Sequence, residues 1–422
     1  MVKKICYFIL LIIVVFVVIY IWKSETINEN ANSEMKSLTE PHQGKLIDER
    51  KKVVDITDND ALAIDKVIKQ MSIDEKIGQM IFAGISGTTL TKETESLIGK
   101  YKVGGIILFA NNLENPEQSI ELLNQIKTEN RQNELPILLG VDQEGGRVER
   151  LPSLAKLPSS REIAARNNEE LSYEIGVLLA EQLHAFGFNV NFAPVLDINS
   201  NPNNPVIGDR SFGDNPEIVN KLGIQTMEGM QSKNIITAVK HFPGHGDTDV
   251  DSHLELPKVE KSLKKLEELE LIPFKHAIEV GTDIVMTAHI LLPEIDSELP
   301  ASMSEKVIAG ILREQLGFDG VVITDDMTMQ AITDHYDIGE AAVDSIKAGT
   351  DIILMAHDYE GLVSVFDMLK EAVIGGEISE DRIDESLRRI IRLKREYKIA
   401  DEQVESIDIE GLNEMIEKVL DE

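Results

Sequence analysis

The 422-residue sequence predicts an α/β fold, namely a single (β/α)8 barrel of the TIM type with additional C-terminal helices and an N-terminal membrane anchor. Short apolar, β-branched runs alternate with amphipathic stretches of helical period, which is typical of parallel βα units. The runs are apolar on both faces, as strands are when helices cover both sides of a sheet. There are eight of them, at residues 80–84, 104–110, 136–142, 190–198, 236–242, 283–290, 320–326 and 351–356.

An open, doubly wound sheet fits the same alternation, and polar residues at the ends of the runs decide between the two folds. In a barrel the C-terminal ends of all strands open on one face, where active sites of this fold lie, whereas an open sheet spreads some ends toward its edges. We therefore expect a barrel with the polar side chains gathered at its mouth. The run ends carry Asp142, Asp197, Lys240, His241, His289, Asp325 and Asp326.

Helix signals fill the gaps between the runs. Ser72 and Glu75 form the pattern of a capping box. Asn115, followed by a proline, opens a second helix, and Gly317 ends a third. Residues 378–422 have apolar residues at helical spacing, so we expect closing helices packed on the barrel.

The N-terminal part falls into two segments. Residues 5–22 form an unbroken apolar run that, as a helix, would span about 27 Å, close to the ~30 Å hydrocarbon core of a bilayer. Lys3 and Lys4 precede it, and the positive-inside bias places the rest of the chain outside the cytoplasm. Cleavage as a signal peptide, giving a secreted protein, is the alternative, but no clear cleavage site follows. The expected domains are a transmembrane anchor at 1–22, a flexible polar tether at 23–60, the catalytic barrel at 61–400 and a helical tail at 401–422.

Composition narrows the classes of function. The charge sum of 42 − 74 = −32 would repel a phosphate backbone, so we expect no nucleic-acid partner. Cys6 is the single cysteine, so neither an intramolecular disulfide nor a cysteine zinc site can form. Hydrophobic residues at 42% and charged residues at 27% are close to globular proportions, so most of the chain can fold around a core.

The densest chemical signal is the segment KHFPGHGDTDVDSH, from Lys240 to His253, which begins as the fifth run and continues as a loop. Its histidines and aspartates are suitable metal ligands, which keeps a metal-dependent hydrolase open as an alternative. No H-x-x-x-H pair on a helix is evident and a neighbouring lysine opposes a cation, so we expect neither a metal nor another cofactor. A solvated polar turn is the structural alternative, but such density at a strand end favours a site.

The segment VDQEGGRVER ends the third run with Asp142, whose carboxylate can accept hydrogen bonds from two hydroxyls. Glu144, Arg147 and Glu149 are interpreted instead as a tight structural loop with an Arg–Asp salt bridge. Arg210 lies in a loop that is too long and polar to be a mere connection.

The seventh run ends in two adjacent acids, Asp325 and Asp326. Successive side chains of a strand point to opposite sides, so one carboxylate can face the mouth while the other is held at the rim.

At these segments the sequence resembles glycoside hydrolase family 3, and within it the β-N-acetylglucosaminidase branch. KHFPGHGDTDVDSH, VDQEGGRVER, GDRSFG and ITDDMTM look like hallmark segments of that branch in the expected order, and the resemblance spans roughly residues 65–400. It implies that Asp325 is the nucleophile and that His253, paired with Asp251, is the acid/base. It implies sugar-binding positions at Asp142, Arg150, Arg210, Lys240 and His241.

The resemblance implies a retaining exo-β-N-acetylglucosaminidase that acts through a covalent glycosyl-aspartate intermediate. With the anchor, the expected substrate is peptidoglycan or its fragments outside the membrane. A histidine can serve as proton donor near neutral pH, especially if Asp251 fixes its tautomer. The alternatives are a β-glycosidase or phosphorylase of the same family with another sugar or acceptor, and a non-catalytic wall-binding barrel. We expect a monomer whose partner is a carbohydrate.

Overall fold

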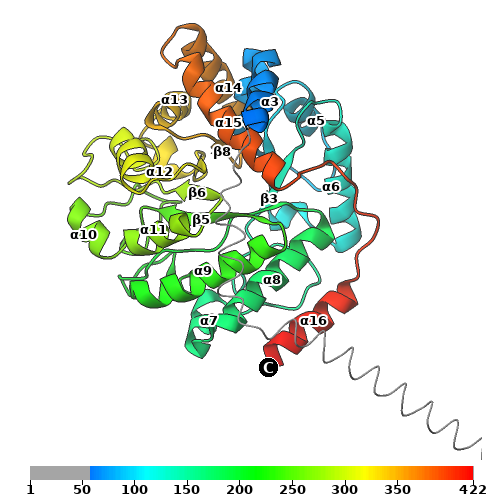
Figure 1. The fold of residues 1–422 in the computed structure, drawn as a ribbon, viewed down its shortest axis with the longest axis vertical. Coiled ribbons are helices and arrows are strands. Elements are labelled where there is room, and N and C mark those ends of the chain that lie inside the picture. The colour runs from blue at the N-terminus through cyan, green and yellow to red at the C-terminus, as the bar shows by residue number, and fades with distance from the viewer. Residues whose placement is uncertain (1–57, 422) are drawn as a thin grey trace, which may run out of the picture. The chain divides into compact units, whose positions relative to one another are not determined.

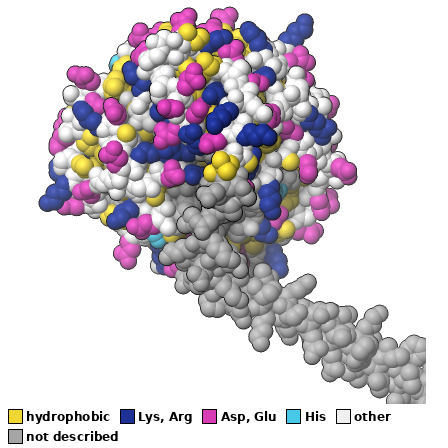
Figure 2. Space-filling view, turned by 45° about the horizontal axis from the view of Figure 1, so that its top comes forward, with side chains coloured by type: hydrophobic (Ala, Val, Ile, Leu, Met, Phe, Trp, Pro, Cys, Tyr) yellow, Lys and Arg dark blue, Asp and Glu magenta, His cyan; other side chains and the backbone are white. Residues whose placement is uncertain are grey.

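The computed structural model describes residues 58–421 (Figure 1). The predicted anchor and all but the last residues of the predicted tether lie outside the described residues. Within residues 58–421, no helix is both long and apolar enough to span a bilayer. Figure 2 shows acidic and basic side chains interspersed over the visible face rather than gathered in a stripe of one sign.

Eight parallel strands form one sheet in the order β7-β6-β5-β4-β3-β2-β1-β8. Strand β1 pairs in parallel with β8, the last strand in the chain. A bridge between Ile323 and Ile352 then joins β7 to the start of β8, so the sheet closes on itself. The predicted (β/α)8 barrel is therefore confirmed. The strands are β1 (Ile81–Gly84), β2 (Gly105–Leu108), β3 (Leu138–Val141), β4 (Val190–Asn191), β5 (Ile236–Phe242), β6 (Ile284–Thr287), β7 (Val321–Thr324) and β8 (Ile353–Met355).

Helices surround the strands, as Figure 1 shows. They include α3 (Asp58–Gln70), α4 (Ile73–Gln79), α5 (Lys92–Gly99), α6 (Pro116–Asn130), α7 (Ser160–Arg166), α8 (Glu169–Phe186), α9 (Pro216–Ser232), α10 (Leu263–Glu268), α11 (Leu271–Glu279), the π-helix η3 (Lys306–Gln315), α12 (Gln330–Thr333), α13 (Ile338–Ala348), α14 (Tyr359–Ile374), α15 (Glu380–Glu396) and α16 (Ile409–Asp421).

The three helix signals are confirmed. Ser72 and Glu75 form a reciprocal capping box on α4. The Asn115 side chain accepts a hydrogen bond from the third residue of α6, whose first residue is proline. Gly317 follows η3 with a φ of +71°, a left-handed conformation that favours glycine.

Strand β4 is much shorter than the predicted run 190–198. Pro194 has no N–H to donate to a ladder, and beyond Asn191 the backbone bonds to its neighbours irregularly. Leu196 N still donates to Lys240 O at 2.7 Å, so the segment continues alongside β5. The irregular stretch places Asp197 fully buried at the mouth.

Two aromatic rings fill the barrel interior. Phe82 on β1 and Phe192 after β4 meet edge to face with ring centroids 5.3 Å apart. Glycines in the facing strands make the space, because a Cβ at Gly105 would lie 2.4 Å from the Phe82 ring and one at Gly140 would lie 2.7 Å from Phe192. An alanine at either position would clash with the packed rings.

Helix α15 closes the N-terminal end of the barrel. Its buried Lys394 donates from Nζ to Gln79 Oε1 at 2.7 Å, Gly104 O at 3.0 Å and Pro136 O at 2.8 Å. Gln79, Gly104 and Pro136 lie one or two residues before the first residues of β1, β2 and β3, respectively. The Lys394 side chain therefore connects the N-terminal ends of these three strands. Lys394 thus ties α15 to the N-terminal end of the barrel, opposite the face where active sites of this fold lie.

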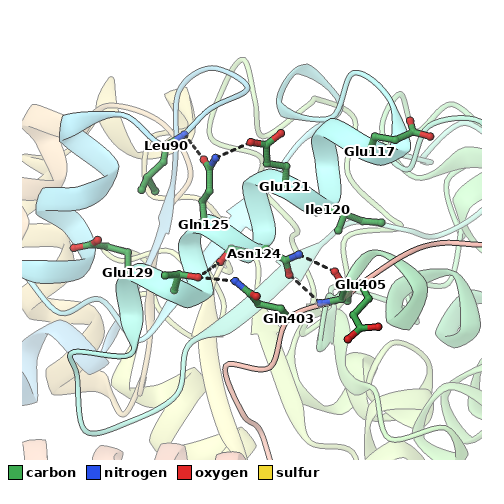
Figure 3. A pocket seen from close by; sticks show the side chains of 11 residues that line it. Leu90, Glu117, Ile120, Glu121, Asn124, Gln125, Glu129, Gln403 and Glu405 are labelled. Atoms are coloured by element: carbon green, nitrogen blue, oxygen red, sulfur yellow. Dashed lines mark hydrogen bonds between the residues drawn. The ribbon is translucent and has the colours of Figure 1, made fainter.

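The chain then runs along α6 before it ends in α16, which packs on α8. Asn124 exchanges two hydrogen bonds with the backbone of Val404, at 2.8 and 2.9 Å. A cavity of about 460 Å³ lies here between α6 and residues 403–405, on the outside of the barrel wall (Figure 3). None of the predicted site residues lines it.

Candidate active site

The topology brings the predicted site residues to one end of the barrel. Asp142 directly follows β3, Lys240 and His241 lie near the end of β5, and Asp325 directly follows β7. The strands are parallel and closed into a barrel, so these positions share the C-terminal mouth.

A network of ion pairs joins three of the predicted sugar-binding residues. Lys240 Nζ lies 2.6 Å from Asp142 Oδ1 and 2.7 Å from Glu144 Oε1. Arg210 forms a bidentate ion pair with Glu144, in which Nε lies 2.9 Å from Oε2 and Nη2 lies 2.7 Å from Oε1. Burial would raise the pKa of Glu144, but the two cations outweigh it and hold the pKa well below its ordinary value.

Glu144 corrects the sequence interpretation, which assigned it to a structural loop. It is buried between Arg210 and Lys240 and holds both cations in place beside Asp142. Arg147 of that loop does pair with an aspartate, but the partner is Asp209 from the separate 201–217 loop, with Arg147 Nε 2.7 Å from Asp209 Oδ1.

A second carboxylate, Asp197, orients the histidines of the β5 segment. Its side chain is fully buried and accepts from His241 Nδ1 at 2.7 Å and from His245 N at 2.6 Å. Burial would raise the pKa of Asp197, but the nearby His241 and His245 lower it. With Nδ1 held by Asp197, the His241 ring presents Nε2 as the atom that can meet a ligand.

Asp325 is anchored by its backbone. Its N–H donates to Thr287 O at 2.9 Å, and its Oδ1 accepts from Asp326 N at 2.8 Å. Burial by itself would raise the pKa of the carboxyl, but His241 and His289 outweigh it and lower the pKa to about 2. Asp325 is therefore ionised near neutral pH, as a nucleophile must be.

The neighbouring Asp326 is held at the rim, as the strand alternation predicts. Its carboxylate accepts from Ala356 N at 2.9 Å and from Thr328 Oγ1 at 2.6 Å. Asp326 therefore joins the ends of β7 and β8 and leaves Asp325 as the acid placed for chemistry.

Asp251 and His253 form a hydrogen-bonded pair on the loop after β5. His253 Nδ1 lies 2.7 Å from Asp251 Oδ1, and the His253 backbone N–H donates to the same oxygen at 2.9 Å. The side chain of His253 is 63% exposed. A proton on Nδ1 is therefore donated in a hydrogen bond to Asp251. The other ring nitrogen, Nε2, points away from that carboxylate and is able to exchange a proton with a ligand. His253 is also one of the groups that lower the pKa of Asp325.

Arg150 stands apart from the ion-pair network. Its backbone N–H donates to Gln143 Oε1 at 2.8 Å, while its side-chain Nε is buried without a hydrogen-bond partner among residues 58–421. A buried donor of this kind is costly unless a ligand or water satisfies it, which is consistent with the predicted binding role.

Four further groups at the mouth were not among the predicted catalytic and sugar-binding residues. Two of them, Asp197 and His289, stood at predicted strand ends and could have been included on that ground. His289 is buried, with Nδ1 bonded to Ser302 Oγ at 2.7 Å. The third and fourth, Glu144 and His245, lay within the two densest motifs.

Elsewhere in residues 58–421, as at the mouth, no group of three histidine, cysteine or acidic side chains is arranged to hold a metal.

A (β/α)8 barrel whose mouth holds an ionised carboxylate, a buried charged network and an exposed Asp–His pair defines an enzyme of the barrel hydrolase type. The glycosyl hydrolase family 3 N-terminal domain matches residues 72–393. The chain belongs to this family and is a glycoside hydrolase, which confirms the resemblance seen in its motifs.

Individual relatives agree with this assignment. The chain is 36% identical over 332 residues to the beta-hexosaminidase A of Pseudoalteromonas piscicida, covering 73% of this chain and 56% of that relative. It is 39% identical over 281 residues to the beta-hexosaminidase of Nitrosomonas eutropha, covering 65% of this chain and 79% of that relative. The solved family 3 beta-N-acetylglucosaminidase from Paenibacillus sp. FPU-7 is 41% identical with a TM-score of 0.79, covering 83% of this chain and 68% of that structure.

Proposed function

We propose that the protein is a retaining exo-β-N-acetylglucosaminidase that removes terminal N-acetylglucosamine from a glycan. The observation that carries the proposal is the presence, around one barrel mouth, of ionised Asp325 and the Asp251–His253 pair. Relatives named beta-hexosaminidase and beta-N-acetylglucosaminidase support the choice of sugar.

The reaction divides into two steps. Asp325 attacks the anomeric carbon and forms a glycosyl ester, while His253 gives its proton to the departing glycosidic oxygen. The neutral His253 then takes a proton from water, which attacks the ester and releases the sugar with its β-configuration retained. Asp251 accepts from Nδ1 throughout, so it holds the ring in place without carrying the transferred proton.

The charged network supplies the sugar contacts. Asp142 can accept from two hydroxyls, while Lys240 and Arg210 donate to hydroxyl or carbonyl oxygens. Because Glu144 already holds both cations, they need no large rearrangement when the sugar enters. A site whose donors and acceptors are preset in this way favours one orientation of one terminal residue.

Purified protein should release para-nitrophenol from para-nitrophenyl N-acetyl-β-glucosaminide, with kcat/KM roughly tenfold or more above that for the matching β-glucoside. The first sugar product seen by NMR should be the β-anomer, with no dependence on added phosphate and no loss on chelation. A preference for the glucoside would favour another glycosidase, and phosphate dependence would indicate a phosphorylase. Loss on chelation would favour the metal-dependent hydrolase, and absence of all turnover would favour a wall-binding barrel.

We also propose that the enzyme works outside the cell membrane, held by residues 1–22, with peptidoglycan or its fragments as substrate. The proposal rests on the long apolar run and the two lysines that precede it. In cells expressing the full chain, activity should sediment with membranes and be lost when intact, wall-stripped cells are treated with protease. Deletion of residues 1–22 should move the activity to the soluble fraction with unchanged turnover on the aryl substrate. Activity of the full chain in the soluble cytoplasm would contradict this proposal.

A further inference from the structure

The loop that carries the Asp251–His253 pair has a fixed stem, residues 243–249, and a tip, residues 250–256. Lys261 holds the stem, because its Nζ lies 3.0 Å from Asp247 Oδ2 and 2.5 Å from Glu270 Oε1. At Gly246 the backbone presses against the barrel so closely that a Cβ there would lie 1.7 Å from Ile198 O. The stem is therefore part of the barrel wall, whereas His253 in the tip is exposed.

One side chain of the stem reaches into the tip. His245 is buried, its Nε2 lies 3.0 Å from Ser252 Oγ, and its Nδ1 lies 2.9 Å from Thr248 Oγ1. The Thr248 hydroxyl also lies 3.1 Å from His245 O, and when it donates to this carbonyl it accepts from Nδ1. In that arrangement the ring proton is on Nδ1, and Nε2 accepts from the Ser252 hydroxyl.

Ser252 also joins the tip to the segment that carries the nucleophile. It is buried between Asp251 and His253, and its carbonyl accepts from Ala331 N at 3.3 Å. Ala331 belongs to α12, which follows Asp325 within the same β7 connection. Ser252 is thus bonded through its side chain to the stem and through its backbone to the nucleophile's connection.

We propose that His245 and Ser252 are a positioning pair, which sets the place of the Asp251–His253 proton donor relative to Asp325. The proposal rests on the proposed function. Neither residue transfers a proton to the substrate; the hydrogen bond between them fixes where His253 stands when the glycosidic bond breaks. Proton transfer to a leaving group needs hydrogen-bond distance, so a displacement of the donor by about 1 Å is costly.

The surroundings keep His245 in the required form. Burial and the neighbouring His241 lower the pKa of His245 to about 4, while Asp197 and Asp325 oppose them. The ring is therefore neutral near pH 7, so one of its two nitrogens remains an acceptor. It also meets the His241 ring edge to face at a centroid distance of 5.8 Å, which further limits its rotation.

The test compares two substrates with the same terminal sugar, whose leaving groups differ in their need for a proton. Chitobiose has a sugar leaving group that must be protonated, whereas the dinitrophenyl N-acetyl-β-glucosaminide departs without assistance. The measured quantity is kcat/KM, which reports the glycosylation step in both cases. Ser252→Ala should lower kcat/KM for chitobiose about tenfold or more and leave that for the dinitrophenyl substrate within about twofold of wild type.

Three further variants sharpen the test. His245→Phe, which fills the space without a hydrogen bond, should show the same substrate-dependent loss, and His245→Gln, whose amide oxygen can still accept from Ser252, should recover part of it. The double variant His245→Phe/Ser252→Ala should be no worse than the poorer single variant, because both remove one bond. Ser302→Ala deletes a comparable buried hydroxyl beside His289, and any loss there should fall equally on both substrates.

An equal loss on both substrates in Ser252→Ala and His245→Gln would show that the pair only supports the fold, and it would overturn the proposal. Unchanged chitobiose cleavage in folded Ser252→Ala would overturn it as well. A wild-type protein that cleaves neither substrate would instead refute the proposed glycosidase function.

Discussion

Asp325→Asn should abolish turnover on every substrate, lowering kcat/KM by roughly 10,000-fold or more. An amide of the same size preserves the packing at the end of β7, but it cannot form the glycosyl ester. The loss should not depend on the leaving group, because a better leaving group does not replace a nucleophile. Aryl N-acetylglucosaminide kinetics, with thermal unfolding to show that the fold is kept, checks this expectation.

Asp326→Asn is the matched control, since it neutralises the adjacent acid. Asp326 accepts hydrogen bonds from the β8 end and from Thr328, so its neutralisation should lower the unfolding temperature and retain far more activity than Asp325→Asn. If Asp325→Asn keeps more than about a hundredth of wild-type kcat/KM on dinitrophenyl and para-nitrophenyl substrates, Asp325 is not the nucleophile.

His253→Ala should produce the second largest effect, and this effect should depend on the substrate. For chitobiose, kcat/KM should fall by about 100- to 10,000-fold, the range that general acid catalysis supplies. With the dinitrophenyl substrate, Asp325 should still be glycosylated. Hydrolysis of the resulting ester should then be slow, because no general base activates the attacking water. Stopped-flow absorbance should show a burst followed by a slow steady rate.

Azide should accelerate that steady rate, because it attacks the ester without needing a general base. Asp251→Asn should give a weaker form of the same defect, since it alters the ring's orientation and leaves the imidazole in place. Equal chitobiose cleavage by His253→Ala and wild type would remove His253 from the role of proton donor.

The fold was accessible from sequence because strand burial and strand ends leave local signals. Eight apolar runs gave the strand count, and the helix signals at Ser72, Asn115 and Gly317 coincided with real helix ends. The run 190–198 shows the limit of this reasoning. Its apolar pattern reflects burial, whereas only Val190 and Asn191 belong to the ladder.

The site was only partly accessible, because its organisation depends on contacts between distant segments. Glu144 looked like a loop residue, and its partners Arg210 and Lys240 lie 66 and 96 positions away along the chain. No local pattern reveals such a pairing. His245 lay within a motif that was singled out, yet its partner Ser252 has no chemical signature of its own, so the connection required geometry.

The central claim is that catalysis proceeds through a covalent sugar ester on Asp325. Its most direct test is incubation with a fluorinated N-acetylglucosaminide that forms the glycosyl-enzyme faster than it breaks down, followed by mass spectrometry of the intact and digested protein. We expect a single sugar adduct on the peptide that contains Asp325, and its absence in Asp325→Asn. An adduct on another carboxylate, or turnover of natural substrate with an α-configured first product, would contradict the account.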